Sequence, residues 1–146
     1  GMHHEISVDV QAPANVLWRA VADVTRWPDW TPTIDEVVLL DGGLAVGARV
    51  RIGQPKLRTL VYRVDDWQDG SRFSWAAATS GVRIQAAHEV YPAAGGSRLR
   101  LTVDMTGPMS PVLAALVGGR TRRYADTEAA GLRRFAEQLA AGTDAA

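Results

Sequence analysis

The stretch Asp23–Trp30 reads Asp-Val-Thr-Arg-Trp-Pro-Asp-Trp and holds two of the five tryptophans in this 146-residue chain. Pro28 disfavours helix at Trp27, yet it suits the first position of a new helical turn. A single tight turn would place Trp27 and Trp30 on one face, because side chains three positions apart are neighbours on a helix. Two rigid apolar rings with N–H donors on a short connector can cap a core or line the mouth of a pocket.

The composition is that of one globular domain. Charged residues make up 22% of the chain, the formal net charge is zero and no cysteine is present. The even charge balance gives no electrostatic footprint for nucleic acid or a membrane surface, and the lack of cysteine excludes disulfides, a thiol nucleophile and a thiolate metal site. No apolar run is long enough to span a bilayer, and the N-terminal residues lack the apolar core of a signal peptide. We expect a cytoplasmic protein, in which Gly1 is a scar of tag cleavage.

Alternation of apolar and polar residues predicts strands on both sides of the tryptophan turn. His4–Val10 alternates strictly, and a helix is expected from Pro13 to about Ala22. Alternation in the later part of the chain turns Trp67 outward beside Arg72. Closely spaced turn signals, typical of an antiparallel meander, separate the further expected strands. These are Ile34–Leu40, Arg49–Ile52, Leu60–Trp67, Arg72–Ala78, Val82–Tyr91 and Arg98–Met105.

From Ser110 to Ala141 the apolar period becomes helical. Gly118-Gly119 predicts a kink or break about two turns into this helix, because glycine is a poor helix former. Residues 142–146 are expected to fray. One face of the helix carries Leu113, Val117, Arg120, Tyr124, Gly131 and Phe135.

The expected hairpins set a cross-strand register. If Val90 faces the interior, a turn centred on Ala94–Gly95 pairs it with Leu99. The same register places Glu89 opposite Arg100 on the outer face, where the two charges can pair. The other inward pairs are His88 with Leu101, Ala86 with Val103, and Ile84 with Met105.

Several short motifs spread over residues 4–140 resemble one known superfamily. They are Val8-Asp9-Val10-Gln11-Ala12-Pro13, Val16-Leu17-Trp18, the stretch Asp23–Trp30, Gly81, His88-Glu89-Val90, Gly96-Ser97-Arg98-Leu99 and Gly131-Leu132-Arg133-Arg134. In this order they resemble the START-like superfamily called SRPBCC, and within it the polyketide cyclase/dehydrase and lipid transport family.

The resemblance implies an α+β helix-grip fold, with a single START-like domain at residues 2–141. In this fold a curved antiparallel sheet of six or seven strands wraps a long C-terminal helix, and two short helices follow the first strand. Family members have an apolar cavity between the sheet and the helix. They include lipid carriers, hormone receptors and aromatase/cyclases.

Small residues bear on whether such a cavity exists. Ala76-Ala77-Ala78 and Ala86-Ala87 occupy central strands, where a solid core would favour larger side chains. Gly131 is expected on the helix face that looks back at them. Either these residues border a cavity, or they let the helix and the sheet approach closely with no void.

The candidate ligand-binding residues are those expected to face such a cavity. The two tryptophans of the turn would lie at its mouth, and Arg120 and Tyr124, which are four apart on the helix, would supply polarity. Alternatively, Arg120 extends to solvent and Tyr124 is ordinary core. The full set is Trp27, Trp30, Tyr62, Trp75, His88, Met105, Arg120 and Tyr124.

The candidates for catalysis are His88, Arg120 and Tyr124. An interior imidazole near a pocket can exchange protons near neutral pH, whereas a buried histidine held by one hydrogen bond is purely structural. No nucleophile–base pair can be assigned. His3 and His4 point to opposite faces of a strand, so we expect no metal site, and no cofactor is implied.

Two functions fit these features best. The first is binding of a small hydrophobic ligand, lipid-like or aromatic and polyketide-like, in the internal cavity. The alternative is a cofactor-free polyketide aromatase/cyclase or dehydratase, in which hydrogen bonds join His88 to Arg120 or Tyr124. A third is a module that binds a protein through its outer sheet face or its tryptophan loop. We expect a small hydrophobic partner and neither nucleic acid nor integral membrane association, and the sequence indicates no protein partner.

Overall fold

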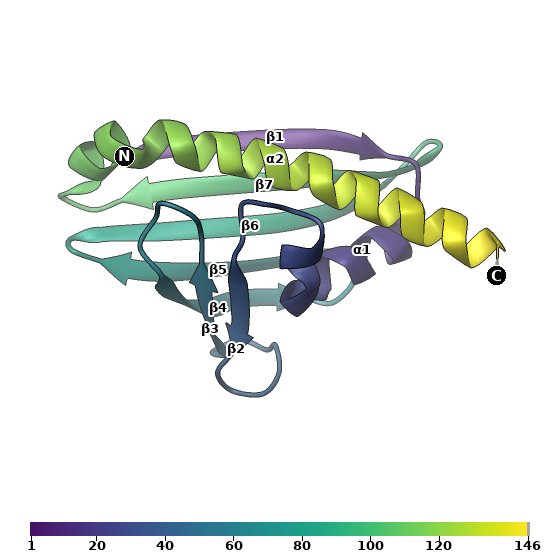
Figure 1. Ribbon diagram of the computed structural model, residues 1–146, viewed down its shortest axis with the longest axis horizontal. Coiled ribbons are helices and arrows are strands. Elements are labelled where there is room, and N and C mark those ends of the chain that lie inside the picture. Colours follow the sequence, from purple (N-terminus) through teal and green to yellow (C-terminus); the bar gives the residue numbers. More distant parts are fainter. Residues whose placement is uncertain (146) are drawn as a thin grey trace.

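A curved antiparallel sheet and one long helix make up most of the molecule (Figure 1). The computed structural model describes residues 1–145, with side chains up to residue 142. The seven strands pair in the order β1-β7-β6-β5-β4-β3-β2, which confirms the predicted α+β architecture. The elements are β1 (Met2–Val10), α1 (Ala14–Ala22), the 3-10 helix η1 (Val24–Asp29), β2 (Glu36–Leu39), β3 (Arg49–Gly53), β4 (Leu60–Gln68), β5 (Arg72–Thr79), β6 (Val82–Ala93), β7 (Gly96–Thr106) and α2 (Ser110–Ala145).

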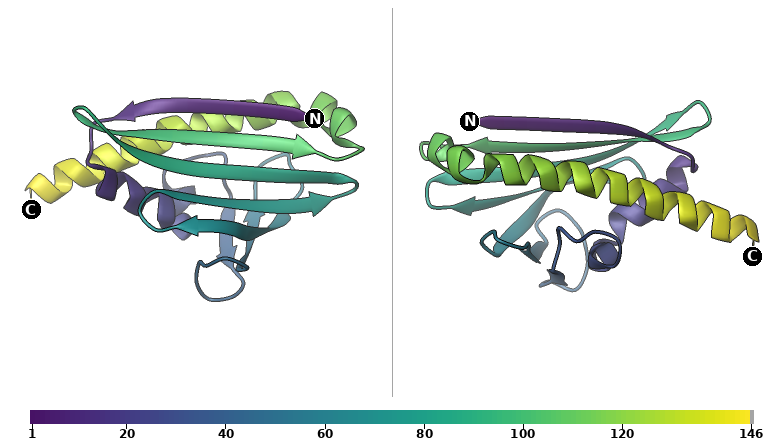
Figure 2. Two further views of the ribbon diagram at one scale, coloured as in Figure 1. Left: turned by 180° about the vertical axis from the view of Figure 1, so that it is seen from behind. Right: turned by 45° about the horizontal axis from the view of Figure 1, so that its top comes forward.

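All helices lie on one face of the sheet. The long helix α2 runs along β1 and β7, and its C-terminal half crosses α1 (Figure 1). Seen from behind, the sheet presents its other face uncovered by helices (Figure 2). The interior therefore lies between the concave face of the sheet and the layer formed by α1, η1 and α2.

The predicted register of the hairpin between β6 and β7 is confirmed. Val90 pairs with Leu99, and the three other inward pairs also match the prediction. On the outer face, Nη1 of Arg100 lies 3.1 Å from Oε1 of Glu89, as expected for this register. A shift of the pairing by one residue would turn every side chain of the strand to the opposite face. The apolar pattern and the position of the turn are therefore both consistent with this one register.

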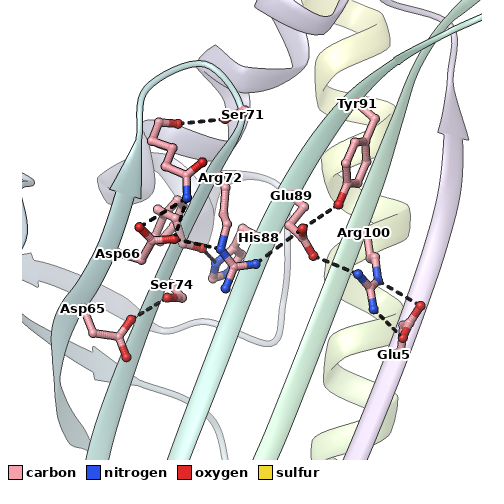
Figure 3. A network of polar contacts seen from close by, with 12 residues as sticks. Glu5, Asp65, Asp66, Ser71, Arg72, Ser74, His88, Glu89, Tyr91 and Arg100 are labelled. Atoms are coloured by element: carbon pink, nitrogen blue, oxygen red, sulfur yellow. Dashed lines mark hydrogen bonds and ion pairs between the residues drawn. The ribbon is translucent and has the colours of Figure 1, made fainter.

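The Glu89–Arg100 pair belongs to a charge ladder that crosses the outer face from β1 to β4 (Figure 3). Arg100 also holds Glu5 of β1, with Nη2 and Oε2 2.9 Å apart. Arg72 of β5 contacts Glu89 at 3.4 Å and Asp66 of β4 at 2.8 Å. These pairs lie at the surface, with Glu89 and Arg72 half-buried, and surface ion pairs each add little stability. The alternating charges therefore act mainly by favouring one strand order and register.

The predicted outward position of Trp67 is wrong. The pairing of β4 with β5 shifts between Val64 and Asp66, and this bulge inserts one residue into the alternation. Trp67 therefore turns to the inner face, where its ring centroid lies 5.3 Å from that of Phe73 and 5.4 Å from that of Trp18. A bulge leaves no mark in the apolar pattern, so alternation alone could not reveal it.

The tryptophan turn forms η1 and packs between the sheet and α2. Trp27 is only 3% exposed, and its Nε1 donates to the carbonyl oxygen of Val21 at 3.2 Å. The ring of Trp30 stacks on Phe135 of α2, with centroids 6.3 Å apart. A Cβ at Gly131 would lie 2.7 Å from Cε3 of Trp30, so the absent side chain makes room for the indole.

The predicted break at Gly118-Gly119 is wrong, since α2 is helical throughout Ser110–Ala145. Gly118 is buried, and a Cβ there would lie 3.2 Å from Sδ of Met2 in β1. Tertiary packing thus outweighs the weak helix propensity of glycine. The expected fraying of residues 142–146 stays a prediction, and residue 146 lies outside the described residues.

Replacing Gly131 with alanine tests the contact between α2 and the tryptophan turn. Alanine favours helix by about 1 kcal/mol, but here its Cβ must displace the Trp30 indole, so we expect a net loss of about 1–3 kcal/mol in the free energy of unfolding. Gly119→Ala is the matched control, because a Cβ there meets only the flexible end of Arg123 at 3.4 Å. Urea unfolding should show the control to be stabilised. Equal stabilisation of both variants would contradict the close contact.

Candidate functional site: a cavity between the sheet and the long helix

A cavity of about 410 Å³ lies between the concave face of the sheet and α2. Most of its walls are apolar. The sheet contributes Tyr62, Trp75, Ile84, Ala86, His88, Val103 and Met105; α2 contributes Leu113, Val117, Thr121, Tyr124, Ala125 and Glu128; η1 contributes Trp27; and loops and strand ends contribute Ile34, Ile52, Gln54, Leu57 and Leu60.

The cavity opens at the N-terminal end of α2. Lining residues that are exposed to solvent gather there: Val112 is 51% exposed and Leu116 75%. Lys56 and Arg58, in the loop between β3 and β4, border the same opening and are also exposed. At the opposite end, the buried ring of Trp27 closes the cavity.

The structure brings most of the predicted site residues together. Trp30 and Arg120 are not among the lining residues. Trp30 packs outside the cavity against α2, and the inward position on the helix belongs to Thr121 rather than to Arg120. Trp27 lies at the closed end and not at the mouth. The residues that do line the cavity are Trp27, Tyr62, Trp75, His88, Met105 and Tyr124.

The small residues of the central strands have different surroundings. Ala86 faces the cavity, whereas Ala77 and Ala87 are buried outside it. Ala78 is exposed on the outer face. Of the two interpretations of these alanines, the cavity border therefore holds for Ala86. Ala87 alternates with the inward-facing Ala86 and His88, so it lies on the outer face of the sheet, away from the helix.

His88 is a buried, uncharged histidine. It is 5% exposed, its ring stacks on Phe73 with centroids 4.2 Å apart, and its Nδ1 lies 3.4 Å from the carbonyl oxygen of Phe73. Burial lowers the pKa of the imidazole to about 3. Near neutral pH this ring is a neutral part of the wall, which favours the structural interpretation of His88 over proton exchange.

Tyr124 ties α2 to the loop between β3 and β4. Its hydroxyl donates to the carbonyl oxygen of Pro55 at 2.6 Å. The bond spans the side of the cavity near the mouth, since both the loop and Tyr124 belong to the lining. Because this hydroxyl proton is already donated within the protein, a ligand meets mainly the aromatic ring of Tyr124.

Glu128 places a carboxyl group in this apolar wall. Its Oε1 accepts hydrogen bonds from the hydroxyl of Thr33 at 3.0 Å and from Nε2 of Gln54 at 3.4 Å. The hydroxyl of Thr31 lies 2.8 Å from that of Thr33, and both threonines are buried. The segment that directly follows Trp30 therefore holds the carboxyl group in position.

The environment of Glu128 changes its ionisation. Burial raises the pKa of the carboxyl group to about 7, against the opposing effect of the hydrogen bond from Thr33. Burial, assisted by the charge of Glu128, also raises the pKa of the Tyr62 phenol. Glu128 is consequently the lining group whose charge changes close to neutral pH, as candidate functional groups in pockets often do.

The sequence interpretation missed Glu128, although its position carried a signal. Glu128 follows Tyr124 by four residues and Thr121 by seven, and these spacings place all three side chains on one face of a helix. An acidic residue that continues an inward-facing stripe is unusual, because burying a carboxyl group without a counter-charge is costly.

Two other kinds of site are not found in the described part of the chain. No three histidine, aspartate or glutamate side chains in it lie close enough to hold a metal ion. Nor is any of its helices both long and apolar enough to cross a membrane.

Comparison with protein families gives one match over nearly the whole chain. The model of the family described as "Polyketide cyclase / dehydrase and lipid transport" matches residues 2–140. No curated protein matches the chain.

Solved structures share the fold at low sequence identity. The Zhui aromatase/cyclase from Streptomyces is 20% identical, with a TM-score of 0.75 over 94% of each chain. A START superfamily protein from Mycobacterium smegmatis is 17% identical, with a TM-score of 0.72 over 95% of this chain and 99% of that one. At such identities the likeness shows the fold alone.

Replacing Glu128 with glutamine tests the raised pKa of this half-buried carboxyl group. In the folded protein the pKa is raised from 4.5 to about 7, so the folded state holds its proton more tightly than the unfolded state. The contribution of Glu128 to stability is therefore fully present below pH 4.5 and is lost as the pH rises to about 7. Glutamine, which mimics the protonated acid, escapes this loss. We expect Glu128→Gln to gain up to about 3 kcal/mol relative to wild type between these pH values.

Urea unfolding of both proteins from pH 4 to pH 8 measures this difference. His88 titrates in the opposite sense, because its lowered pKa removes stability as the pH falls below 6.5. That contribution is common to both proteins and cancels in the comparison. A difference in unfolding free energy that stays constant with pH would contradict the raised pKa of Glu128.

Proposed function

Because the chain belongs to the polyketide cyclase / dehydrase and lipid transport family, we propose that its cavity binds one small, largely apolar ligand, lipid-like or aromatic. The observation that carries the proposal is the cavity of about 410 Å³ itself. Small-molecule sites in proteins typically occupy about 300–1,000 Å³ and have apolar walls with a few polar groups.

A space of this size is hard to explain as a packing defect. Protein interiors are close-packed, with few voids larger than a water molecule. Water gains little in an apolar cavity, because it finds few hydrogen-bond partners there. Trp27, Trp75 and Met105, by contrast, offer polarisable surface to rings and alkyl chains. An apolar ligand that enters through the mouth beside Leu116 would bury surface that water solvates poorly.

The second candidate is a cofactor-free aromatase/cyclase or dehydratase, which the family description and the Streptomyces relative suggest. Its expected signature was a network joining His88 to Arg120 or Tyr124. Instead, His88 contacts Phe73, Tyr124 bonds to Pro55, and Arg120 lies outside the lining. We therefore favour binding over turnover. An enzymatic role would have to rest on Glu128, the lining group that exchanges a proton near neutral pH.

Filling the cavity tests the binding function. Ala86→Phe would place a ring in the space, while Ala78→Phe adds the same ring on the exposed outer face and serves as the control. The neutral fluorophore N-phenyl-1-naphthylamine should bind wild type and the control at one saturable site. We expect Ala86→Phe to weaken that binding by about tenfold or more, since the ring occupies the volume the probe needs.

Fluorescence titration measures the affinities, and circular dichroism checks that each variant is folded. Equal binding by all three proteins would place the probe elsewhere and contradict the proposal. So would a lack of saturable binding by wild type.

A further inference from the structure

We propose that Glu128 makes the cavity selective for a ligand that carries a protonated amine on an otherwise apolar body. This inference rests on the proposed ligand-binding function and adds the chemical class of the ligand. A carboxylate in an apolar pocket favours an ammonium group, because a charge-assisted hydrogen bond is stronger than a neutral one.

The two oxygens of the Glu128 carboxyl group have different surroundings. Oε1 accepts from Thr33 and Gln54, so both of its lone pairs are used. Oε2 meets no donor among the described residues. Oε2 is not fully buried either. Among the described residues, the fully buried polar side-chain atom without a hydrogen-bond partner is Nε1 of Trp30, and Oε2 is not in that class. Since Oε2 is accessible and Glu128 lines the cavity, a ligand donor inside the cavity can reach this oxygen.

Among the described residues, no positively charged side chain pairs with Glu128. Lys56 and Arg58 border the mouth in exposed positions, where water screens their charges. Arg58 donates to the hydroxyl of Thr79. His88, on the sheet wall, is kept neutral by its burial. An ionised Glu128 thus lacks a counter-ion inside the cavity, and a ligand ammonium group can supply one.

Aromatic rings that line the cavity opposite α2 also favour a cation. Tyr62, which is close enough for Glu128 to affect its ionisation, lies 5.8 Å from Trp75 between ring centroids. Trp27 lies 5.5 Å from Trp75 and continues the aromatic wall. Ring faces attract ammonium groups, because the negative face of the π-system favours a cation. The hydroxyl of Tyr124 does not donate to Glu128 in place of a ligand, because it donates to the carbonyl oxygen of Pro55.

Binding of an amine at Glu128 is linked to the release of a proton. With both lone pairs of Oε1 in use, the proton of the neutral acid resides on Oε2. An ammonium ligand that binds the neutral acid must displace this proton to solvent, which leaves an ion pair with no net charge. An alcohol or other neutral ligand binds without releasing a proton. Amine binding therefore weakens as Glu128 becomes protonated, and alcohol binding does not.

Isothermal titration calorimetry with nonylamine, 1-nonanol and nonanoic acid separates the three ligand classes. These probes share an alkyl chain and differ only in the polar group. Wild type, Glu128→Gln and Glu36→Gln are compared at pH 6 and pH 8, each in two buffers of different ionisation enthalpy. Glu36 is an exposed acid outside the cavity and provides the matched control.

We expect wild type and the control to bind the amine about tenfold or more tightly than the alcohol at pH 8, and to bind the acid weakest. Since Glu128 titrates at about pH 7, amine affinity should fall about tenfold from pH 8 to pH 6, with close to one proton released at pH 6. Glu128→Gln should lose the amine preference and the proton release, while its alcohol affinity is kept.

Three outcomes overturn the inference, and they separate the role of Glu128 from ligand binding itself. Equal binding of amine and alcohol by wild type, or an amine affinity unchanged in Glu128→Gln, would refute the role of Glu128 and leave ligand binding in place. Failure of all three probes to bind wild type would refute both the amine class and the proposed binding function.

Discussion

The wedge formed by Trp27 and Trp30 is the interaction on which the interior depends. Trp27 fills the space under the C-terminal half of α2, packing on Phe73 and Trp75 with centroids 6.4 and 5.5 Å away. Trp30 seats against Gly131 of the helix. The helix is thereby anchored at one end, while side chains of its N-terminal half, among them Leu113, Val117 and Tyr124, line the cavity. The position of the cavity follows from this asymmetry.

The same turn links the cavity to its chemistry. Thr31 and Thr33 follow Trp30 in the sequence, and their hydroxyl groups contact each other. The hydroxyl of Thr33 donates a hydrogen bond to Glu128 and so positions this residue in the cavity wall. A carboxyl group in such surroundings lowers the stability of the folded protein at neutral pH, because burial disfavours its charged form. Residues that reduce stability without a structural benefit are typical of functional sites. The cavity is therefore distinguished by an apolar lining that contains one poorly solvated carboxyl group.

Regular patterns made most of the fold predictable, and local exceptions set the limits. The alternation in β6 and β7 gave the register directly, and the spacing of apolar residues gave α2. The bulge near Asp66 was invisible to the same logic and reversed Trp67. On α2, the helical period locates the inward face only to within about one residue. The prediction therefore placed Arg120 in the lining where the structure has Thr121, and it did not include Glu128. Which inward residues border a void and which pack solidly depends on the curvature of the sheet, and no sequence pattern encodes that curvature.

Native mass spectrometry of the protein, purified without detergent and then incubated with apolar amines, counts the ligands that bind each chain. We expect a single adduct of one ligand per chain, and we expect Ala86→Phe, with its cavity filled, to lose that adduct. A spectrum that shows only the bare chain at every ligand concentration, or that shows several adducts of equal strength in both proteins, would contradict a single internal binding site.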